Sequence, residues 1–187
     1  MLETPFDVFR DELNPGERMI WNGQPQQGFL LRPSDALLIP FSLLWGGSAI
    51  FWEANVVLSG APFSFMLAGI PFVLIGLYLI FGRFFVDMTQ RRKTYYALTN
   101  ERVMIISGMF KRNIKSLDLK QLPEINITTR NDGKGTITFG PSYPMGWMSS
   151  VGGFSNAGSY PVAPGFEMIE DAKRVYQQIK RLQRGEG

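Results

Sequence analysis

Two long stretches without a charged residue limit what this 187-residue chain can fold into. The first covers residues 36–52 and the second covers residues 54–82, with Glu53 between them. A helix of about 20 apolar residues crosses the hydrocarbon core of a bilayer, which is roughly 30 Å thick. The second stretch contains PFSFMLAGIPFVLIGLYLIF and reaches that length, whereas the first is nearer the lower limit. We therefore expect two membrane-spanning helices that insert together as a hairpin, linked by residues 53–61.

The flanking charges predict which way the two helices cross. The link contains no lysine or arginine, whereas Arg83, Arg91, Arg92 and Lys93 follow the second stretch. Because basic residues stay on the cytoplasmic side, both termini are expected in the cytoplasm. A cleaved signal peptide does not fit the first stretch, since residues 1–34 before it include five acidic side chains. The alternative is two buried helices of a soluble protein, but such helices normally carry a polar face and neither stretch shows one.

Positive charge gathers after the second stretch. Residues 1–34 hold three basic and five acidic residues, whereas residues 83–120 hold nine basic and three acidic residues. Anionic headgroups attract such a region by about 1 kcal/mol per basic residue near the surface. The candidate surface contacts are Arg91, Arg92, Lys93, Lys111, Arg112 and Lys115. The alternative is that these charges only set the topology. The net charge of the whole chain, +3, is too small to indicate nucleic acid.

After Lys93 the pattern changes to that of short β-strands. The predicted strands occupy residues 94–99, 103–107, 114–119, 122–129 and 136–139. Asp132-Gly133 predicts a type I′ turn before the last of them. A further short strand at 19–21 is expected to pair with this sheet across the hairpin. Short strands joined by short turns predict a meander that curls into a small barrel or sandwich.

The end of the chain predicts a helix. Phe166, Ile169, Ala172, Tyr176 and Ile179 recur every three or four positions. Acidic residues near the expected start, basic residues near the end and a final Gly185 suit the helix dipole and a C-terminal stop. We expect the apolar stripe to cover the strands, with a partner-binding helix as the alternative.

Residues 140–165 form an uncharged stretch rich in glycine, proline and serine. A structureless loop of this length is uncommon in a compact domain. One interpretation is that it holds irregular strands that complete the barrel. The other is a loop whose aromatic residues, including Trp147, touch the bilayer surface or a partner together with Met145 and Met148.

The residue types that most enzyme mechanisms need are missing. The chain has no cysteine and no histidine, which excludes disulfides, thiol nucleophiles, Cys/His zinc sites and imidazole bases. It also has no GxxxxGK[ST] phosphate loop and no GxSxG elbow. We therefore expect no enzyme, no metal and no cofactor. The predicted spans hold no charge, so ion transport through them is not expected either.

Three sequence motifs in a fixed order resemble a known family. They are LNPGERMIWNGQP before the hairpin, RRKTYYALTNERVMIISG after it and FEMIEDAKRVYQQI near the C-terminus. This order resembles the bacterial membrane proteins with a pleckstrin-homology-like (PH-like) domain. Their pattern is Pro-Gly-Glu with a downstream Trp and Pro, a hydrophobic hairpin, and then Tyr-x-Leu-Thr-Asn-x-Arg. The matching residues are Pro15, Gly16, Glu17, Trp21, Tyr96, Leu98, Thr99, Asn100 and Arg102.

The resemblance implies an α+β membrane protein. A two-helix transmembrane hairpin would carry a cytoplasmic PH-like domain, built as a seven-strand curved sheet or barrel capped by a C-terminal helix. We divide the chain into a cytoplasmic N-terminal segment (1–34), the hairpin (35–85) and the PH-like domain (86–187). PH domains that bind phosphoinositides use clustered basic residues in the first hairpin loop, which is Asn100-Glu101-Arg102 here, so phosphoinositide binding is not expected. Arg102 is instead a candidate to bind carbonyl groups or to pair with Glu17 or Asp118.

These observations predict a multi-pass protein of the bacterial cytoplasmic (inner) membrane with both termini in the cytoplasm. It would act there as a non-enzymatic binding module at the cytoplasmic face. Its expected partners are the lipid bilayer, a protein that the sequence does not identify and a second copy of the chain, but not nucleic acid. The alternative is a structural or assembly subunit of a membrane complex that acts through its transmembrane helices.

Overall fold

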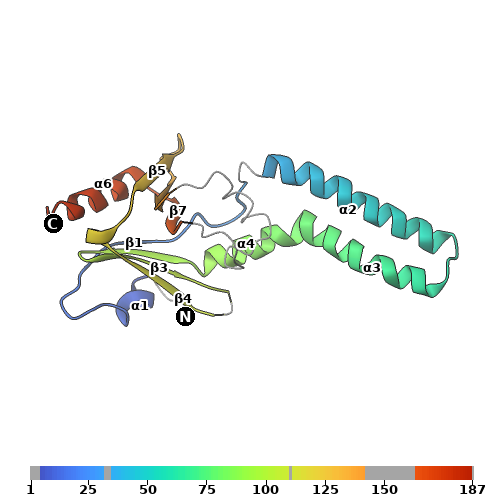
Figure 1. Cartoon of the computed structure of the whole chain (residues 1–187), viewed down its shortest axis with the longest axis horizontal. Coiled ribbons are helices and arrows are strands. Elements are labelled where there is room, and N and C mark those ends of the chain that lie inside the picture. Colours follow the sequence, from blue (N-terminus) through green and yellow to red (C-terminus); the bar gives the residue numbers. More distant parts are fainter. Residues whose placement is uncertain (1–4, 32–34, 110, 142–162, 187) are drawn as a thin grey trace. The chain divides into compact units, whose positions relative to one another are not determined.

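The computed structural model describes residues 5–31, 35–109, 111–141 and 163–186, and these residues form two compact units. The sheet unit takes residues from both ends of the chain, up to Gly28 and from Met88 onward. The hairpin unit lies between them in the sequence, from Phe29 to Asp87 (Figure 1). The hairpin is therefore an insertion into the sequence of the sheet unit.

Four antiparallel strands form the first sheet, in the order β1-β2-β3-β4. Their bounds are Met19–Gly23 (β1), Tyr95–Thr99 (β2), Arg102–Ser107 (β3) and Asn113–Asp118 (β4). Strand β1 pairs with β2, with Met19 opposite Thr99 and Gly23 opposite Tyr96. This pairing confirms the short strand expected at 19–21, and it joins the two segments that flank the hairpin in the sequence.

Three antiparallel strands form the second sheet, in the order β5-β6-β7. Their bounds are Ile125–Thr129 (β5), Gly135–Phe139 (β6) and Gly165–Ile169 (β7). The two sheets of the described residues do not close into the barrel that the sequence suggested. Between β4 and β5 the chain passes through a short 3-10 helix, η2 (Leu119–Gln121), and then Pro123, which has no N–H to extend a strand ladder.

The hairpin between β5 and β6 contains Asp132-Gly133 but not the predicted turn type. A type I′ turn needs a positive φ at both central residues, and of these two only Gly133 has one, 82°. The Gly133 N–H donates to the Arg130 carbonyl (3.1 Å), and the Arg130 N–H donates to the Lys134 carbonyl (2.7 Å). This pattern is a three-residue loop with glycine in the left-handed position. Asp132 instead uses its carboxylate to accept the Lys134 N–H at 3.1 Å, as turn aspartates often do.

The C-terminal helix α6 (Ala172–Gln183) starts later than predicted, because Gly165–Ile169 is strand β7. Phe166 and Ile169 are buried, as the apolar spacing indicated, but they reach the core from a strand. The pairing of β6 with β7 shifts register, and Met168 has a left-handed φ of 46°. This irregularity brings two residues three positions apart to the same face, so the spacing imitated a helix.

The predicted end of α6 is confirmed. The N–H groups of Gly185 and Glu186 donate to the carbonyls of Leu182 (3.0 Å) and Arg181 (3.1 Å). Gly185 has a φ of 77°, and glycine adopts this left-handed conformation without a steric cost. The pattern is the Schellman motif, which satisfies the last carbonyls of a helix.

The first sheet is buried on both faces. Residues such as Leu98, Val103 and Ile105 join the second sheet and α6 in the main core. On the opposite face, Met104 and its neighbours pack against Phe9 of α1 (Pro5–Arg10), which is fully buried. Burial on both sides explains why β3 reads as a continuous apolar run rather than an alternating one.

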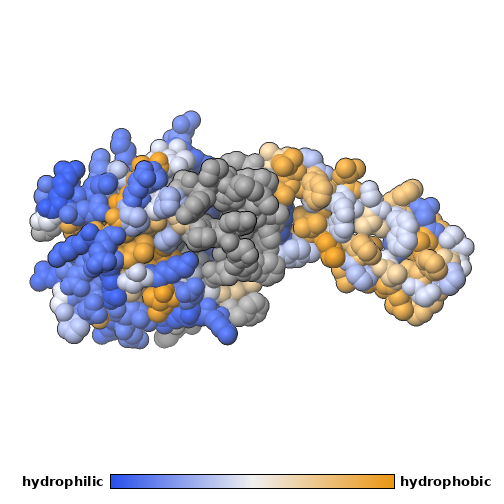
Figure 2. Space-filling model, viewed as in Figure 1, coloured by the Kyte–Doolittle hydropathy of each residue, from blue (hydrophilic) through white to orange (hydrophobic). Residues whose placement is uncertain are grey.

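The hairpin unit consists of two long helices. Helix α2 spans Asp35–Leu58, and the second helix runs from Phe63 to Arg92 through α3 (Phe63–Leu77), a π-helical segment η1 (Tyr78–Gly82) and α4 (Arg83–Arg92). Both helices are long and apolar enough to span a membrane. Apolar side chains cover most of the visible surface of α2 and α3, whereas the visible surface of the sheet unit is mainly hydrophilic (Figure 2).

The expected link between the helices was too long. Helix α2 continues to Leu58, so Glu53 and the five residues after it are helical and only residues 59–62 connect the helices. The charged Glu53 thus belongs to a candidate span, which the sequence analysis treated as uncharged. Asn55 in this segment satisfies its side-chain amide within the helix by donating to the Phe51 carbonyl (2.7 Å).

Small residues let the two helices of the hairpin pack closely. Gly69 and Gly76 are both buried. A Cβ at Gly76 would lie 2.8 Å from the Gly46 Cα, and a Cβ at Gly69 would collide with the Glu53 carboxylate. Close backbone approach through small residues is typical of helix pairs in membranes. The two interpretations of residues 140–165, including the role of Trp147, concern a segment of which 142–162 lie outside the described residues.

Candidate functional site

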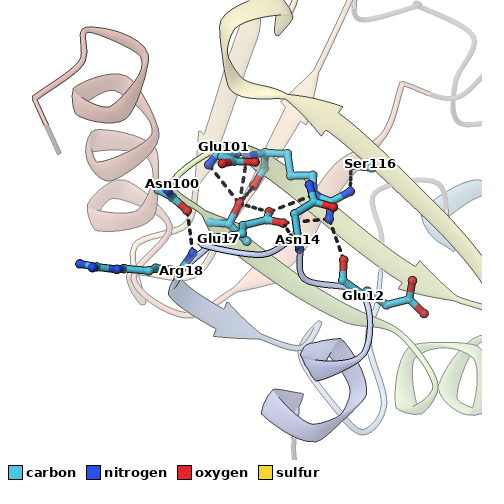
Figure 3. Close-up of polar contacts among 9 residues, drawn as sticks. Glu12, Asn14, Glu17, Arg18, Asn100, Glu101 and Ser116 are labelled. Atoms are coloured by element: carbon cyan, nitrogen blue, oxygen red, sulfur yellow. Dashed lines mark hydrogen bonds and ion pairs between the residues drawn. The ribbon is translucent and has the colours of Figure 1, made fainter.

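A polar network joins the N-terminal segment to the β2–β3 hairpin (Figure 3). The side chain of Glu17 at its centre is fully buried. Arg102 Nε donates to Glu17 Oε1 and Arg102 Nη2 donates to Glu17 Oε2, each at 2.9 Å. This bidentate arrangement is the strong form of an arginine–carboxylate pair. Of the two carboxylates considered for Arg102, Glu17 is therefore the partner.

The remaining polar atoms of this pair also have partners. Arg102 Nη2 donates to the Glu12 carbonyl (2.7 Å), and Arg102 Nη1 donates to Ser116 Oγ (3.4 Å). Glu17 accepts further hydrogen bonds from Thr99 Oγ1 (2.6 Å) and from the Asn14 N–H (2.9 Å). Each guanidinium nitrogen and each carboxylate oxygen is thus satisfied, which is what a buried ion pair needs to be stable.

The local sequence explains how these groups are held. The Glu17 N–H donates to the Asn14 carbonyl (3.0 Å), and Gly16 between them has a φ of 87°. Proline at the second position and a left-handed glycine at the third define a type II turn. On the other side, Asn100 accepts the Arg18 N–H at 2.7 Å and returns its own N–H to the Arg18 carbonyl at 3.1 Å. The Pro-Gly-Glu and Thr-Asn-x-Arg motifs are therefore the two halves of one network.

The network also shifts the titration of both charged groups. Burial alone would raise the pKa of the Glu17 carboxyl, but hydrogen bonds from Arg102, Asn14 and Thr99, with the Arg102 charge, lower it below its ordinary value of 4.5. The hydrogen bond to Glu17 raises the pKa of Arg102, although burial opposes the change. Both shifts favour the ionised forms, so the pair remains charged at neutral pH.

The other residues of the family motif lie in the core. Leu98 is fully buried, and Trp21 and Tyr96 place their ring centroids 5.3 and 4.9 Å from that of Phe166. The Tyr96 hydroxyl accepts the Glu167 N–H of β7 at 3.1 Å, which ties the two sheets together. The motif residues thus form a turn, a network and part of the core, and they explain the fold rather than a ligand site.

The basic residues proposed as surface contacts do not form one group. Arg91 is buried and donates to the carbonyls of Gln26 and Gly28, the latter at 2.7 Å. Arg112 donates to the Val8 carbonyl (2.7 Å) and pairs with Glu12 (3.2 Å). These two arginines hold the N-terminal part of the sheet unit in place.

The remaining basic candidates are exposed and belong to two neighbouring segments. Arg92 and Lys93 end the second helix, whereas Lys111 and Lys115 lie at the β3–β4 turn and on β4. Lys93 Nζ donates to the Met109 carbonyl (3.0 Å), which brings the helix end and the turn together. We call these four residues the basic surface. Trp147, the last candidate contact, lies outside the described residues.

A groove of about 630 Å³ in the sheet unit lies between the segment after β1 and the start of α6. Its lining mixes apolar side chains such as Trp21 with charges of both signs, Lys134 and Arg174 against Glu170 and Asp171. In the described part of the chain, no group of three or more acidic residues is placed to hold a metal ion. The groove offers polar and apolar contacts without a recognisable catalytic pair.

The hairpin unit contains a second buried arginine pair that the sequence analysis missed. Arg83 Nη1 lies 3.1 Å from Asp35 Oδ1, and the two side chains are 8% and 12% exposed. The guanidinium lies 4.5 Å from the centroid of the Phe84 ring, which in turn packs against Phe29. One signal was available, because Gly69, Gly76 and Arg83 are spaced seven apart and so share a helix face.

Comparisons of this chain with protein-family models, with curated proteins and with solved structures find no match.

Proposed function

We propose that this protein is a non-enzymatic binding module with a PH-like domain, anchored by its hairpin at the cytoplasmic face of the bacterial inner membrane. The observation that carries the proposal is the Glu17–Arg102 pair. It joins the segment before the two long helices to strand β3, which follows them in the sequence. A folded unit built from both flanking segments is anchored at two points of its chain rather than by a loose tail. Tethering confines such a unit to a thin layer, so weak contacts there become populated.

The architecture of the sheet unit supports the PH-like part of the proposal. Four and three antiparallel strands, followed by a C-terminal helix that packs on their shared core, agree with the fold that the family resemblance implies. The residues that resemble the family motif supply the turn, the network and the core of this unit. The resemblance and the packing thus depend on the same side chains.

Two features support anchoring in a membrane. Large apolar side chains such as Leu44, Phe51 and Phe72 are exposed on both long helices, where water would be an unfavourable neighbour. The basic surface begins where the second helix ends, and the short connection at 59–62 carries no charge. By the positive-inside rule, the sheet unit with both termini lies in the cytoplasm.

The contacts of the module follow from its surface. Arg92, Lys93, Lys111 and Lys115 would meet anionic headgroups through charge alone, which gives weak and salt-dependent attraction. The groove beside α6 and the exposed faces of the sheet unit would bind a protein partner. A second copy of the chain is one such partner.

Crosslinking in intact membranes, followed by mass spectrometry, tests the proposal. We expect crosslinks from the sheet unit, within residues 94–183, to partner proteins, and tags at both ends that are reached only after the cells are opened. Extraction with alkaline carbonate should leave the full-length chain in the membrane. A chain released by carbonate, or a tail reached from outside intact cells, would refute the membrane anchoring.

The second candidate is an assembly subunit that acts through its transmembrane helices. Glu53 of α2 favours it, because its Oε2 is buried and has no hydrogen-bond partner in the described part of the chain. An ionisable group within a span is costly unless it serves a function, such as binding another helix. Crosslinks that map to residues 36–81 rather than to the sheet unit would favour this candidate.

A further inference from the structure

Only part of the hydrogen-bonding capacity of the Arg83 guanidinium is satisfied in the hairpin unit. Its Nη1 pairs with Asp35, but Nε and Nη2 are buried and have no hydrogen-bond partner among the described residues. These two nitrogens form one edge of the planar guanidinium, and their N–H bonds point the same way. The unused edge is therefore a complete fork, suited to a group with two acceptor oxygens.

The same protein shows what such an edge accepts. In the sheet unit, Arg102 uses its Nε and Nη2 to hold both oxygens of Glu17 at 2.9 Å. The corresponding edge of Arg83 has no oxygen partner among the described residues. Buried donors without partners are costly, and more so when they carry charge. The arrangement is unfavourable as it stands, and an anionic ligand would complete it.

The position of Arg83 along its helix indicates which anion is at hand. From Phe63 to Arg83 the helix advances 20 residues, or roughly 30 Å, which equals the thickness of the hydrocarbon core. Arg83 is also the first charged residue after the uncharged stretch 54–82. With Phe63 at one boundary of the bilayer, Arg83 lies at the other, at the depth where the phosphate groups begin.

The helix surface at the level of Arg83 suits a lipid rather than a free ion. Phe81 and Phe85 lie two positions before and after Arg83, so they point to the other side of the helix, where they are 59% and 67% exposed. Leu37, two positions after Asp35, is 66% exposed. Exposed side chains of this kind suit acyl chains, which bring phosphate groups to this depth. We propose that the free edge of Arg83 binds the phosphate group of a membrane phospholipid. The inference rests on the membrane anchoring proposed above, and it adds a specific lipid contact that charge attraction alone does not provide.

The test counts the lipid molecules that the full-length chain retains. The protein is purified in detergent, stripped of lipid and incubated with phosphatidylglycerol, and retained lipid is measured by native mass spectrometry. Arg83→Lys keeps the positive charge beside Asp35 but removes the fork. We expect this variant to bind phosphatidylglycerol at least about tenfold more weakly than the wild type, as the loss of charge-assisted hydrogen bonds implies.

Two matched variants separate the fork from charge and from the ion pair. Arg184→Lys makes the same change at an exposed arginine of the sheet unit and should leave lipid retention unchanged. Asp35→Asn keeps the guanidinium edge and removes a negative charge beside it, so it should not weaken lipid retention. Equal retention by wild type and Arg83→Lys would overturn the inference, and so would an equal loss in Arg83→Lys and Arg184→Lys.

A measurement on the wild type keeps the test independent of how the variants fold. The Arg83 Nε resonance of ¹⁵N-labelled protein should shift with phosphatidylglycerol but not with a phosphate-free glycolipid. The absence of that shift, or displacement of the lipid by millimolar inorganic phosphate, would overturn the assignment to a phospholipid. Retention after carbonate extraction is measured in parallel, so a failure of this contact is distinguishable from a failure of membrane anchoring.

Discussion

The sheet unit and the hairpin unit each bury one arginine against one carboxylate, but they complete the pair differently. In the sheet unit, Arg102 and Glu17 are surrounded by donors and acceptors from four segments of the chain, and every polar atom has a partner. In the hairpin unit, Arg83 pairs with Asp35 through one nitrogen, and its other two nitrogens have no hydrogen-bond partner in the part of the chain that the structure describes. The protein itself completes the first pair, whereas two donors of the second have no acceptor among the described residues.

This contrast separates a structural role from a binding role for the same residue type. The large majority of polar side-chain atoms that are buried in proteins have hydrogen-bond partners, so exceptions call for an explanation. A complete network such as that of Glu17 fixes one arrangement and costs much to disrupt. An incomplete one indicates where a group from outside the chain, in our proposal a lipid phosphate, completes the hydrogen bonds.

Removing Glu17 should have the strongest effect on the sheet unit. Glu17→Ala leaves Arg102 partly buried without its carboxylate, and removing one partner of such a pair costs roughly 3–5 kcal/mol. Urea unfolding of the full-length chain in detergent, followed by near-UV circular dichroism, measures the loss. Glu101→Ala is the control, because it removes an exposed charge near Arg102 without removing a side-chain hydrogen bond, and should change stability by less than about 0.5 kcal/mol. Equal losses for both variants would mean that charge alone matters.

A methyl group at Gly76 tests the hairpin unit. The added Cβ would lie 2.8 Å from the Gly46 Cα, and backbone atoms cannot give way as a flexible side chain does. Overpacking of this kind costs about 1–3 kcal/mol. We expect Gly76→Ala to lower the thermal unfolding midpoint of the helices in detergent. Gly47→Ala is the matched control, since a Cβ there meets no atom within 4 Å. Identical midpoints would contradict the close approach of the helices.

Acid should weaken the complete pair in a defined pH range. The pKa of Glu17 is lowered in the folded chain, so its ionised form stabilises the fold above the ordinary value of 4.5. This contribution is lost as pH falls below 4.5 through the lower folded-state pKa, at up to about 1.4 kcal/mol per pH unit. Unfolding free energies between pH 7 and pH 3 measure the slope. Glu17→Gln should show a shallower slope by one proton, and parallel profiles for the two proteins would contradict the role of Glu17.

What the sequence predicted correctly depends on local patterns. The strands, the hairpin and the stop at Gly185 each follow from residues within one short window. Glu17 and Asp118 are both candidate partners of Arg102 in the sequence, because a turn arginine can pair with a carboxylate, and only the structure identifies Glu17. Strand irregularities and turn type are not fixed by the residue pattern alone. The irregularity of β7 places Phe166 and Ile169 on one face, as a helix would, and the turn at Asp132 depends on which group its carboxylate accepts, here the Lys134 N–H.

The Asp35–Arg83 pair was missed for a different reason. Charges at the ends of apolar stretches were interpreted as topology signals, and that interpretation does not ask whether two of them meet. Only the antiparallel packing of the helices brings Asp35 and Arg83 together. Glu53 was assigned to the link because a charge ended the first apolar stretch, although helix formation continued for another five residues. Composition marks where a span is polar but not where its helix ends.

Of these ion pairs, the exposed pair of Glu12 and Arg112 should contribute least to the free energy of unfolding. Its atoms lie 3.2 Å apart, but the side chains are 31% and 50% exposed, so water and salt screen the attraction. Glu12→Gln should therefore cost less than about 1 kcal/mol, and the effect should fade in high salt. The Glu12 carbonyl still accepts from Arg102 in this variant, so the network around Glu17 stays intact. A loss comparable to that of Glu17→Ala would show that burial does not distinguish the two pairs, and that the completeness of the hydrogen bonds around Glu17 is not what makes it stable.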